Sequence, residues 1–243
     1  MATTGILALV GGDEFRAHCE PMDHALLAMA ARQPARVVIV PTAAAQQGPH
    51  QAAQNGVRYF TALGAQTTAA MILSPQDANN PALANALADA DLIYLTGGDP
   101  AYLLRCLRDS RCWQAMQARY AAGAMLAGSS AGAMALGAAM RYGRSGGAGW
   151  TLALALAPRI AVLPHHDGPP RTDSPALAAS LAASLHRTDV ALVGIAVATA
   201  CVSDDGGERW QVLGVGAVTL YTAQGATVYH TGDCFILEQS RRV

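Results

Sequence analysis

The stretch MLAGSSAGAMAL, residues 125–136, starts as a short apolar strand pattern and continues as a helix pattern. Ser130 stands at the junction, where Gly128 and Gly132 flank it in a G-x-S-x-G arrangement. Between a strand and a helix, this arrangement is typical of a nucleophile elbow, in which the serine hydroxyl projects above a sheet. The backbone N–H of Ala131 would then lie at a helix N-terminus, where it can donate to a developing oxyanion. The stretch predicts a nucleophilic serine; the alternative is a turn that needs small residues only for packing.

Outward from this stretch, apolar strand patterns alternate with helix patterns through the first half of the chain. The expected strands are 5–12, 35–44, 65–73, 91–98 and 124–130. The expected helices are 20–32, 49–64, 80–90, 99–123 (one helix or two) and 131–139. Such alternation predicts a parallel sheet covered on both faces, with ligands bound at the carboxyl ends of the strands. The second half is expected to hold a Gly-rich loop at 141–150, a strand at 159–167, a helix at 174–188 and mainly β-structure after it, all within a single domain, 1–243.

Composition excludes several classes of function. Hydrophobic residues make up 52% of the 243 residues, but no apolar run approaches the ~20 residues that span a bilayer. The net charge is −1 and only 14% of residues are charged, so we expect a small, peptide-like partner rather than nucleic acid or a membrane. The five cysteines are scattered, which disfavours disulfides and a zinc site. We expect a cytoplasmic protein with no metal or cofactor, and a homodimer is a further, weaker expectation.

Two other motifs fall at the predicted carboxyl ends of strands. The segment LTGGDP ends the strand at 91–98 in a glycine pair, so the Gly98 N–H could be a second oxyanion donor; an ordinary tight turn is the alternative. The segment VLPHHD places His165 and His166 at the end of a later strand. A serine nucleophile needs a general base, and imidazole is the side chain best matched to neutral pH. His165 is the predicted base, with a structural histidine as the alternative.

The segments LTGGDPAYLL, AGSSAGAMAL and VLPHHD, in this order and at these spacings, resemble the serine peptidases typified by peptidase E and cyanophycinase. The resemblance runs from about residue 5 to the C-terminus. It implies an α/β fold, a flavodoxin-like three-layer sandwich with a mostly parallel central sheet of the class I glutamine amidotransferase-like type, with an extra β-rich C-terminal part. It also implies Ser130 as nucleophile, His165 as base, and Gly98 and Ala131 as oxyanion donors.

The activity implied by the resemblance is hydrolysis of short peptides or of aspartyl or isopeptide bonds through an acyl-enzyme, with no cofactor. Glutamine amidotransferases carry cysteine at the elbow, so the serine here argues against glutamine hydrolysis. An α/β-hydrolase esterase fits less well, because no His-Gly-Gly oxyanion motif precedes the elbow.

One part of the family pattern is missing. Many relatives carry a G-I-[DP]-E-x-T-A type motif after the histidine segment, and its acidic residue is expected to orient the histidine. Here residues 194–200 read GIAVATA, with Ala196 and Val197 at the two positions that could be acidic. Loss of the acid in a well-studied triad costs about four orders of magnitude in rate. The acidic residues nearest in the sequence that could replace the missing triad acid are Asp167, Asp204 and Asp205. The alternative function is an impaired family member that binds a small molecule or peptide.

Three residues near the motifs are candidates for substrate binding. Arg171 could grip a substrate carboxylate as a bidentate fork, or be a solvated loop arginine. His166 could face the substrate or support its neighbour. Asp99 follows the glycine pair and is also the expected N-cap of the next helix. The segment HHDGPPRTDSP lacks the arginine-rich, aromatic pattern that cyanophycinases have after the histidine, which argues against cyanophycin as substrate.

Overall fold

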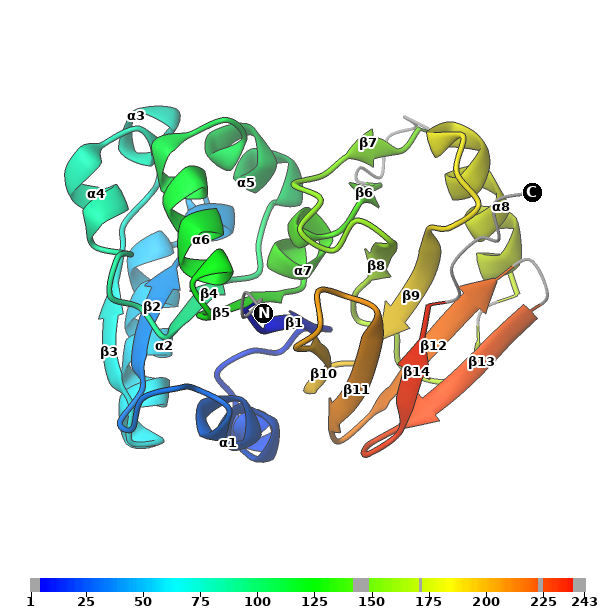
Figure 1. The fold of residues 1–243 in the computed structure, drawn as a ribbon, viewed down its shortest axis with the longest axis horizontal. Helices are drawn as coiled ribbons and strands as arrows, with labels where there is room; N and C mark the ends of the chain where they lie inside the picture. The colour runs from blue at the N-terminus through cyan, green and yellow to red at the C-terminus, as the bar shows by residue number, and fades with distance from the viewer. Residues whose placement is uncertain (1–4, 142–148, 171, 223–224, 238–243) are drawn as a thin grey trace.

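The computed structural model describes residues 5–141, 149–170, 172–222 and 225–237 (Figure 1). Its largest sheet has eight strands in the order β14-β11-β10-β1-β5-β4-β2-β3. The bounds are β1 (Leu7–Val10), β2 (Arg36–Val40), β3 (Gln66–Ala69), β4 (Leu92–Leu95), β5 (Met125–Ser129), β10 (Thr199–Ser203), β11 (Arg209–Gly214) and β14 (Cys234–Ile236). Strands β1 to β5 are parallel, and β10, β11 and β14 extend the sheet in antiparallel fashion from β1. All five strands expected in the first half are present.

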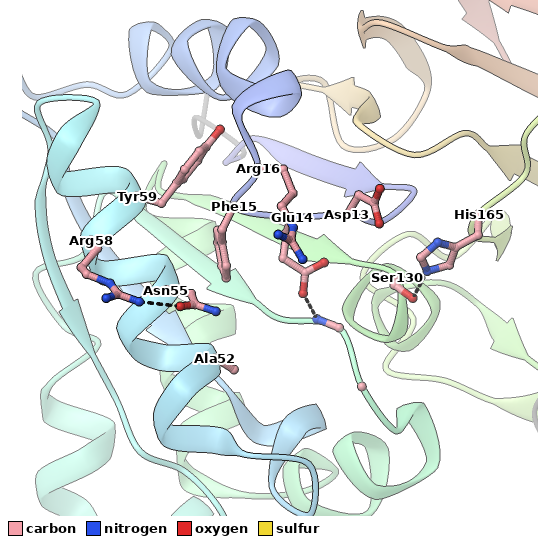
Figure 2. Close-up of a pocket in the computed structure, with 12 residues that line it drawn as sticks. Asp13, Glu14, Phe15, Arg16, Ala52, Asn55, Arg58, Tyr59, Ser130 and His165 are labelled. Carbon is pink, nitrogen blue, oxygen red and sulfur yellow. Dashed lines mark hydrogen bonds between the residues drawn. The ribbon is translucent and has the colours of Figure 1, made fainter.

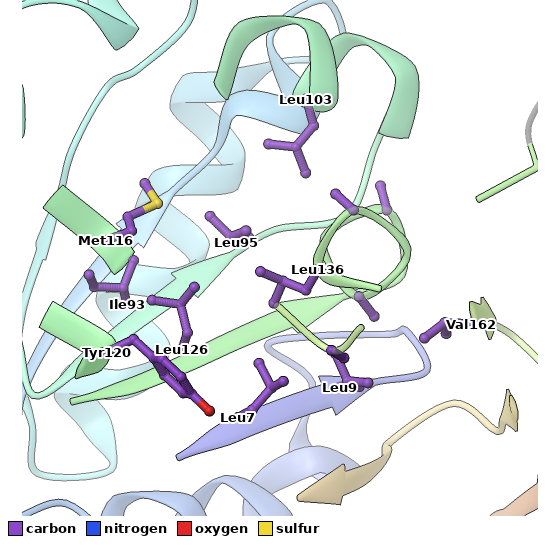
Figure 3. Packing of buried hydrophobic residues seen from close by; sticks show 14 of the residues in the cluster. Leu7, Leu9, Ile93, Leu95, Leu103, Met116, Tyr120, Leu126, Leu136 and Val162 are labelled. Carbon is purple, nitrogen blue, oxygen red and sulfur yellow. The ribbon is translucent and has the colours of Figure 1, made fainter. Parts of the chain in front are cut away.

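Helices cover both faces of the parallel part. The bounds are α1 (Glu20–Ala28), α2 (Pro49–Ala62), α3 (Pro75–Ala78), α4 (Pro81–Asn85), α5 (Pro100–Leu107), α6 (Arg111–Ala121) and α7 (Ala131–Leu136), with 3-10 turns η1 (Ala17–Cys19) and η2 (Thr42–Ala44). Alternate residues of β1 enter different cores, because neighbouring side chains of a strand point to opposite faces. Leu7 and Leu9 pack with α5, α6 and α7, as Figure 3 shows, whereas Ala8 and Val10 pack with α1 and α2. The predicted three-layer sandwich is confirmed.

The segment expected as a helix at 99–123 is two helices. Arg108 leaves the helical region with ψ of 130°, and Asp109 has a φ of 58°. Ser110 is the N-cap of the next helix, α6, and its Oγ accepts a hydrogen bond from the Trp113 N–H at 3.1 Å. The helix expected at 80–90 is also shorter, since only α4 is helical there.

Some strands of the β-rich C-terminal part, with β8, form a second sheet, on the right of Figure 1. It has four strands in the order β13-β12-β9-β8, with bounds β8 (Ile160–Leu163), β9 (Ala191–Ile195), β12 (Ala217–Thr222) and β13 (Gly225–His230). Helix α8 (Ser174–Leu185) packs against β9 and β12, and β6 (Ala139–Met140) pairs with β7 (Thr151–Leu152). One buried apolar cluster runs through both large sheets, joining Leu9 to Val162 and Val193.

Among the described residues, no helix is both long enough and apolar enough to cross a membrane.

Candidate active site

Ser130 occupies a strained turn between β5 and α7. Its φ of 49° and ψ of −105° lie outside the regions that L-residues ordinarily adopt. The turn requires glycine on both sides: a Cβ on Gly128 would lie 2.5 Å from the carbonyl carbon of Gly132, and one on Gly132 would lie 2.5 Å from the Leu95 oxygen. The Ser130 N–H donates to the Val10 carbonyl at 2.9 Å, which ties the turn to β1. The small residues of the elbow are therefore needed for this backbone geometry.

His165 meets Ser130 from the other sheet. It follows β8 with a φ of 50°, and its N–H donates to the Gly11 carbonyl at 2.8 Å. Its Nε2 lies 3.0 Å from the Ser130 Oγ, a hydrogen-bond distance (Figure 2). Gly12 lies directly against the imidazole, since a Cβ there would be 2.3 Å from the ring Cε1. The predicted nucleophile and base are thus brought together by the contact between the two sheets.

Two backbone N–H groups near Ser130 are available as oxyanion donors. Ala131 is the first residue of α7, and Gly98 lines the same cleft as Ser130. Gly98 has a φ of 139°, and a Cβ at this position would lie 2.2 Å from the Ala43 oxygen, so only glycine fits. Within the described part of the chain, neither of these N–H groups has a protein acceptor. Both can therefore donate to a ligand.

A third triad member is not found in the described ranges. No described carboxylate is hydrogen bonded to the Nδ1 of His165. Asp167 instead accepts from the Val197 N–H at 3.2 Å. Asp205 accepts from the Ser203 hydroxyl and from the backbone of the turn that follows, and Asp204 is exposed in the same turn. The arrangement here is a serine–histidine dyad.

The three residues predicted to bind substrate have different locations. His166 points away from its neighbour: it is only 6% exposed, and its Nε2 lies 2.8 Å from the Tyr221 hydroxyl inside the second sheet. Asp99 caps α5, where its Oδ1 accepts from the Ala101 and Tyr102 N–H groups. Arg171 lies outside the described residues. The contacts of His166 and Asp99 are those of structural residues.

The cleft beside the dyad has a volume of about 680 Å³ (Figure 2). Besides Ser130, His165 and Gly98, it is lined by two groups of residues that the sequence analysis missed. One is the loop after β1, and the other is one side of α2: Asp13, Glu14, Phe15, Arg16, Ala52, Asn55, Arg58 and Tyr59, with Gly97. A signal for the loop was present in the sequence, because GGDEF directly follows the first strand and parallel strands end at the same edge. Nothing in the pattern of α2 marked its cleft-facing residues.

Two arginines and two aromatic rings line the cleft on the side of the loop after β1 and of α2. Arg16 and Arg58 are exposed, and the Arg58 Nη2 donates to the Asn55 Oδ1 at 2.8 Å. Phe15 and Tyr59 lie with their ring centroids 5.8 Å apart. A guanidinium has five N–H donors, so Arg58 keeps donors for an anion in the cleft.

Asp23 is buried, and its Oδ2 accepts from the Tyr59 hydroxyl at 2.8 Å. Burial, which disfavours the ionised form, raises the pKa of the Asp23 carboxyl to about 7. The nearby charge of Glu14 adds to this increase, and the Tyr59 hydrogen bond opposes it.

Similarity to known proteins agrees with this geometry. Residues 6–200 match peptidase family S51. The crystal structure of a peptidase from an acI-B1 Actinobacterium is similar with a TM-score of 0.80 and 27% identity, over 97% of this chain and 98% of that one. A "Putative Peptidase E Protein" from Listeria monocytogenes EGD-e has the same fold, with a TM-score of 0.55 and 15% identity over 94% of this chain and 100% of that one. No curated protein matches the sequence significantly.

The family match covers far more than half of the chain and includes all three motifs. The resemblance inferred from those motifs is therefore confirmed: the chain belongs to peptidase family S51 and is a serine-type peptidase.

Proposed function

We propose that the protein hydrolyses short peptides, including aspartyl or isopeptide bonds, through an acyl-enzyme formed on Ser130. The observation that carries the proposal is the 3.0 Å distance between the Ser130 Oγ and the His165 Nε2 at the edge of a 680 Å³ cleft. This is the distance at which a base can take the proton of a nucleophile.

The reaction has two halves. In the first, the Ser130 Oγ attacks the scissile carbonyl carbon while its proton passes to the His165 Nε2, and the N–H groups of Gly98 and Ala131 hold the oxyanion. The His165 proton then goes to the leaving amine as the C–N bond breaks, which leaves an ester on Ser130. In the second half, His165 takes a proton from water as the hydroxide attacks the ester carbonyl carbon. His165 then returns this proton to the Ser130 Oγ as the ester C–O bond breaks, and the acid product leaves.

The dyad is expected to turn over slowly. Nδ1 of His165 has no carboxylate partner among the described residues, so no carboxylate in this part of the chain fixes its tautomer or stabilises the imidazolium. In a complete triad, loss of that support costs about 10⁴ in kcat. A low rate at Ser130, rather than no reaction, is therefore the expected behaviour.

The charged residues that line the cleft are two carboxylates, Asp13 and Glu14, and two arginines, and the arginines are the groups that could receive an acidic group of the substrate. Arg16 and Arg58 are cationic, and Arg58 donates one hydrogen bond to the Asn55 Oδ1 at 2.8 Å. A guanidinium pairs with a carboxylate through two parallel hydrogen bonds, which gives both affinity and orientation. We infer that the substrate's carboxylate lies toward α2 while its scissile carbonyl lies over Ser130.

Fluorophosphonate labelling read by intact mass tests the nucleophile. Wild type is expected to gain one adduct that maps to Ser130, with no adduct in Ser130→Ala and at least about 10³-fold slower labelling in His165→Ala. His24→Ala is the matched control, because His24 is an exposed histidine away from the cleft and should label at the wild-type rate. A folded wild type that does not label would contradict the proposal.

Two series of dipeptides test the preference for substrate charge. The acidic series carries Asp or Glu, and the neutral series carries Asn or Gln at the same position. The acidic members should be cleaved faster, and Arg58→Ala should raise their KM about tenfold while leaving the neutral members unchanged, because only the acidic ones use the guanidinium. Equal effects of Arg58→Ala on both series would contradict the acidic specificity and leave the Ser130 chemistry intact.

A further inference from the structure

Glu14 lies where the loop after β1 crosses the carboxyl ends of β4 and β5 (Figure 2). Its Oε1 accepts from the Gly97 N–H at 2.7 Å, and its Oε2 accepts from the Ser129 hydroxyl at 2.7 Å. Both distances are those of strong, charge-assisted hydrogen bonds. One half-buried carboxylate therefore connects two strand ends that are not adjacent in the sequence.

The two donors adjoin the reacting groups. Gly97 precedes Gly98, the proposed oxyanion donor, and Ser129 precedes Ser130. Ser129 is fully buried, so its hydroxyl needs an acceptor, and Glu14 supplies it. Removal of the carboxylate would leave both donors without this acceptor and allow the Gly97–Gly98 segment to move relative to the elbow.

The same loop also holds the histidine. The Gly11 carbonyl accepts from the His165 N–H, and Gly12 packs against the imidazole ring. Residues 11–14 thus contact the segments that carry the base, the nucleophile and the second oxyanion donor. Glu14 is the only one of these four residues that does so through its side chain.

We propose that Glu14 is a positioning residue of the hydrolytic site, whose carboxylate fixes the Gly98 N–H relative to Ser130; this rests on the proposed function. Oxyanion donors act only when they lie within about 2.7–3.1 Å of the developing oxyanion, and a misplacement of about 1 Å can reduce the rate about 10²-fold. Glu14 acts through Gly97 and Ser129, because both of its oxygens are engaged by these two donors.

Kinetics of fluorophosphonate labelling separate this role from substrate binding and from stability. Glu14→Ala should lower kinact about 10²-fold with little change in KI, since the donor is misplaced while the cleft stays open. Glu14→Gln should stay within about tenfold of wild type, because the amide can accept from the Gly97 N–H and donate to the Ser129 hydroxyl.

Asp77→Ala is the matched control. Asp77 Oδ2 also accepts from one backbone N–H and one serine hydroxyl, those of Leu73 at 3.1 Å and Ser74 at 2.9 Å, but it does not line the cleft. Its replacement should lower the Tm by an amount comparable to Glu14→Ala and leave kinact at the wild-type value.

Each result decides the proposal. A kinact for Glu14→Ala equal to that of Asp77→Ala would overturn it, as would a rise in KI alone, which would make Glu14 a substrate-binding group. A Glu14→Gln variant as slow as Glu14→Ala would show that the negative charge matters rather than the two hydrogen bonds, and would also overturn it. Labelling that persists in Ser130→Ala would instead overturn the proposed function, and this proposal with it.

Discussion

The two sheets present their reacting groups in different ways. In the eight-stranded sheet, Ser130 is held by its own surroundings, with Gly128 and Gly132 next to it in sequence and the Val10 carbonyl from the adjacent strand. In the four-stranded sheet, His165 follows β8 and is held by Gly11 and Gly12, which belong to the other sheet's first loop. The nucleophile is therefore built mainly by local sequence, and the base depends on how the sheets meet.

Gly12→Ala should have the largest effect, because it alters the point where the sheets meet. The added Cβ would lie 2.3 Å from the His165 Cε1, so the ring must move, and the φ of 139° disfavours any side chain. A displacement of more than about 1 Å is expected to slow fluorophosphonate labelling by at least about 10²-fold.

The control for this substitution is Gly64→Ala. Gly64 also has a positive φ, 93°, but nothing lies within 4 Å of the position its Cβ would take. This variant should lose some stability through backbone strain and keep its labelling rate. Normal labelling of a folded Gly12→Ala would show that the position of His165 does not depend on the first sheet.

The same contrast explains what could be predicted from the sequence. The elbow, the five parallel strands and the position of Gly98 follow from local patterns, because apolar runs, glycine turns and helix caps are properties of neighbouring residues. The division of the C-terminal strands between two sheets does not, since β10 pairs with β1 and β11 with β10, whereas β9 pairs with β8 and β12 with β9. Strand partners are set by long-range packing, which local alternation does not encode.

The residues of the candidate site also fall into those that the sequence predicted and those that it did not. Ser130 and His165 carried recognisable chemistry in recognisable motifs. His166, its neighbour, had the same chemistry in the same motif, yet its side chain turns inward to Tyr221. The two residues are tied to different sheets, since the His165 N–H donates to the Gly11 carbonyl and the His166 N–H to the Ile195 carbonyl at 3.0 Å. Glu14 and Arg58 were missed, because their roles arise from strand ends and a helix face that meet only in the folded protein.

Asp23, in helix α1 on the eight-stranded sheet, should make the free energy of unfolding depend on pH. Its pKa is raised from 3.8 to about 7 by burial. Between these pH values the unfolded chain has lost this proton and the folded protein keeps it, so the free energy of unfolding falls as pH rises, by up to about 4 kcal/mol above pH 7. Urea unfolding from pH 4 to 8 should show this slope in wild type and not in Asp23→Asn. An equal slope in both would refute the assignment to Asp23.

Tyr221→Phe tests the inward histidine of the second sheet. The hydroxyl lies 2.8 Å from the His166 Nε2 in a buried site, and losing one partner of a buried hydrogen bond costs about 1–3 kcal/mol. Urea unfolding should show this loss, while the folded variant should label at the wild-type rate. A labelling rate that falls as in His165→Ala would mean that the neighbouring histidines are coupled, and the contrast between them would fail.

The smallest effect on stability is expected for a surface ion pair, Arg187 and Asp189, between α8 and β9 of the four-stranded sheet. Arg187 donates to both oxygens of Asp189, at 2.9 and 2.7 Å, and this pairing lowers the pKa of the Asp189 carboxyl although burial opposes the change. Its stabilisation is therefore present above the unfolded pKa of Asp and is lost as pH falls through the lowered folded pKa, opposite in sign to Asp23. The side chains are 42% and 29% exposed, so solvent screening limits the pair to less than about 1 kcal/mol. Arg187→Ala should lower the free energy of unfolding by that amount at pH 7 and by nothing in acid, and a larger loss at pH 7 would mean that the arginine contributes through packing rather than charge.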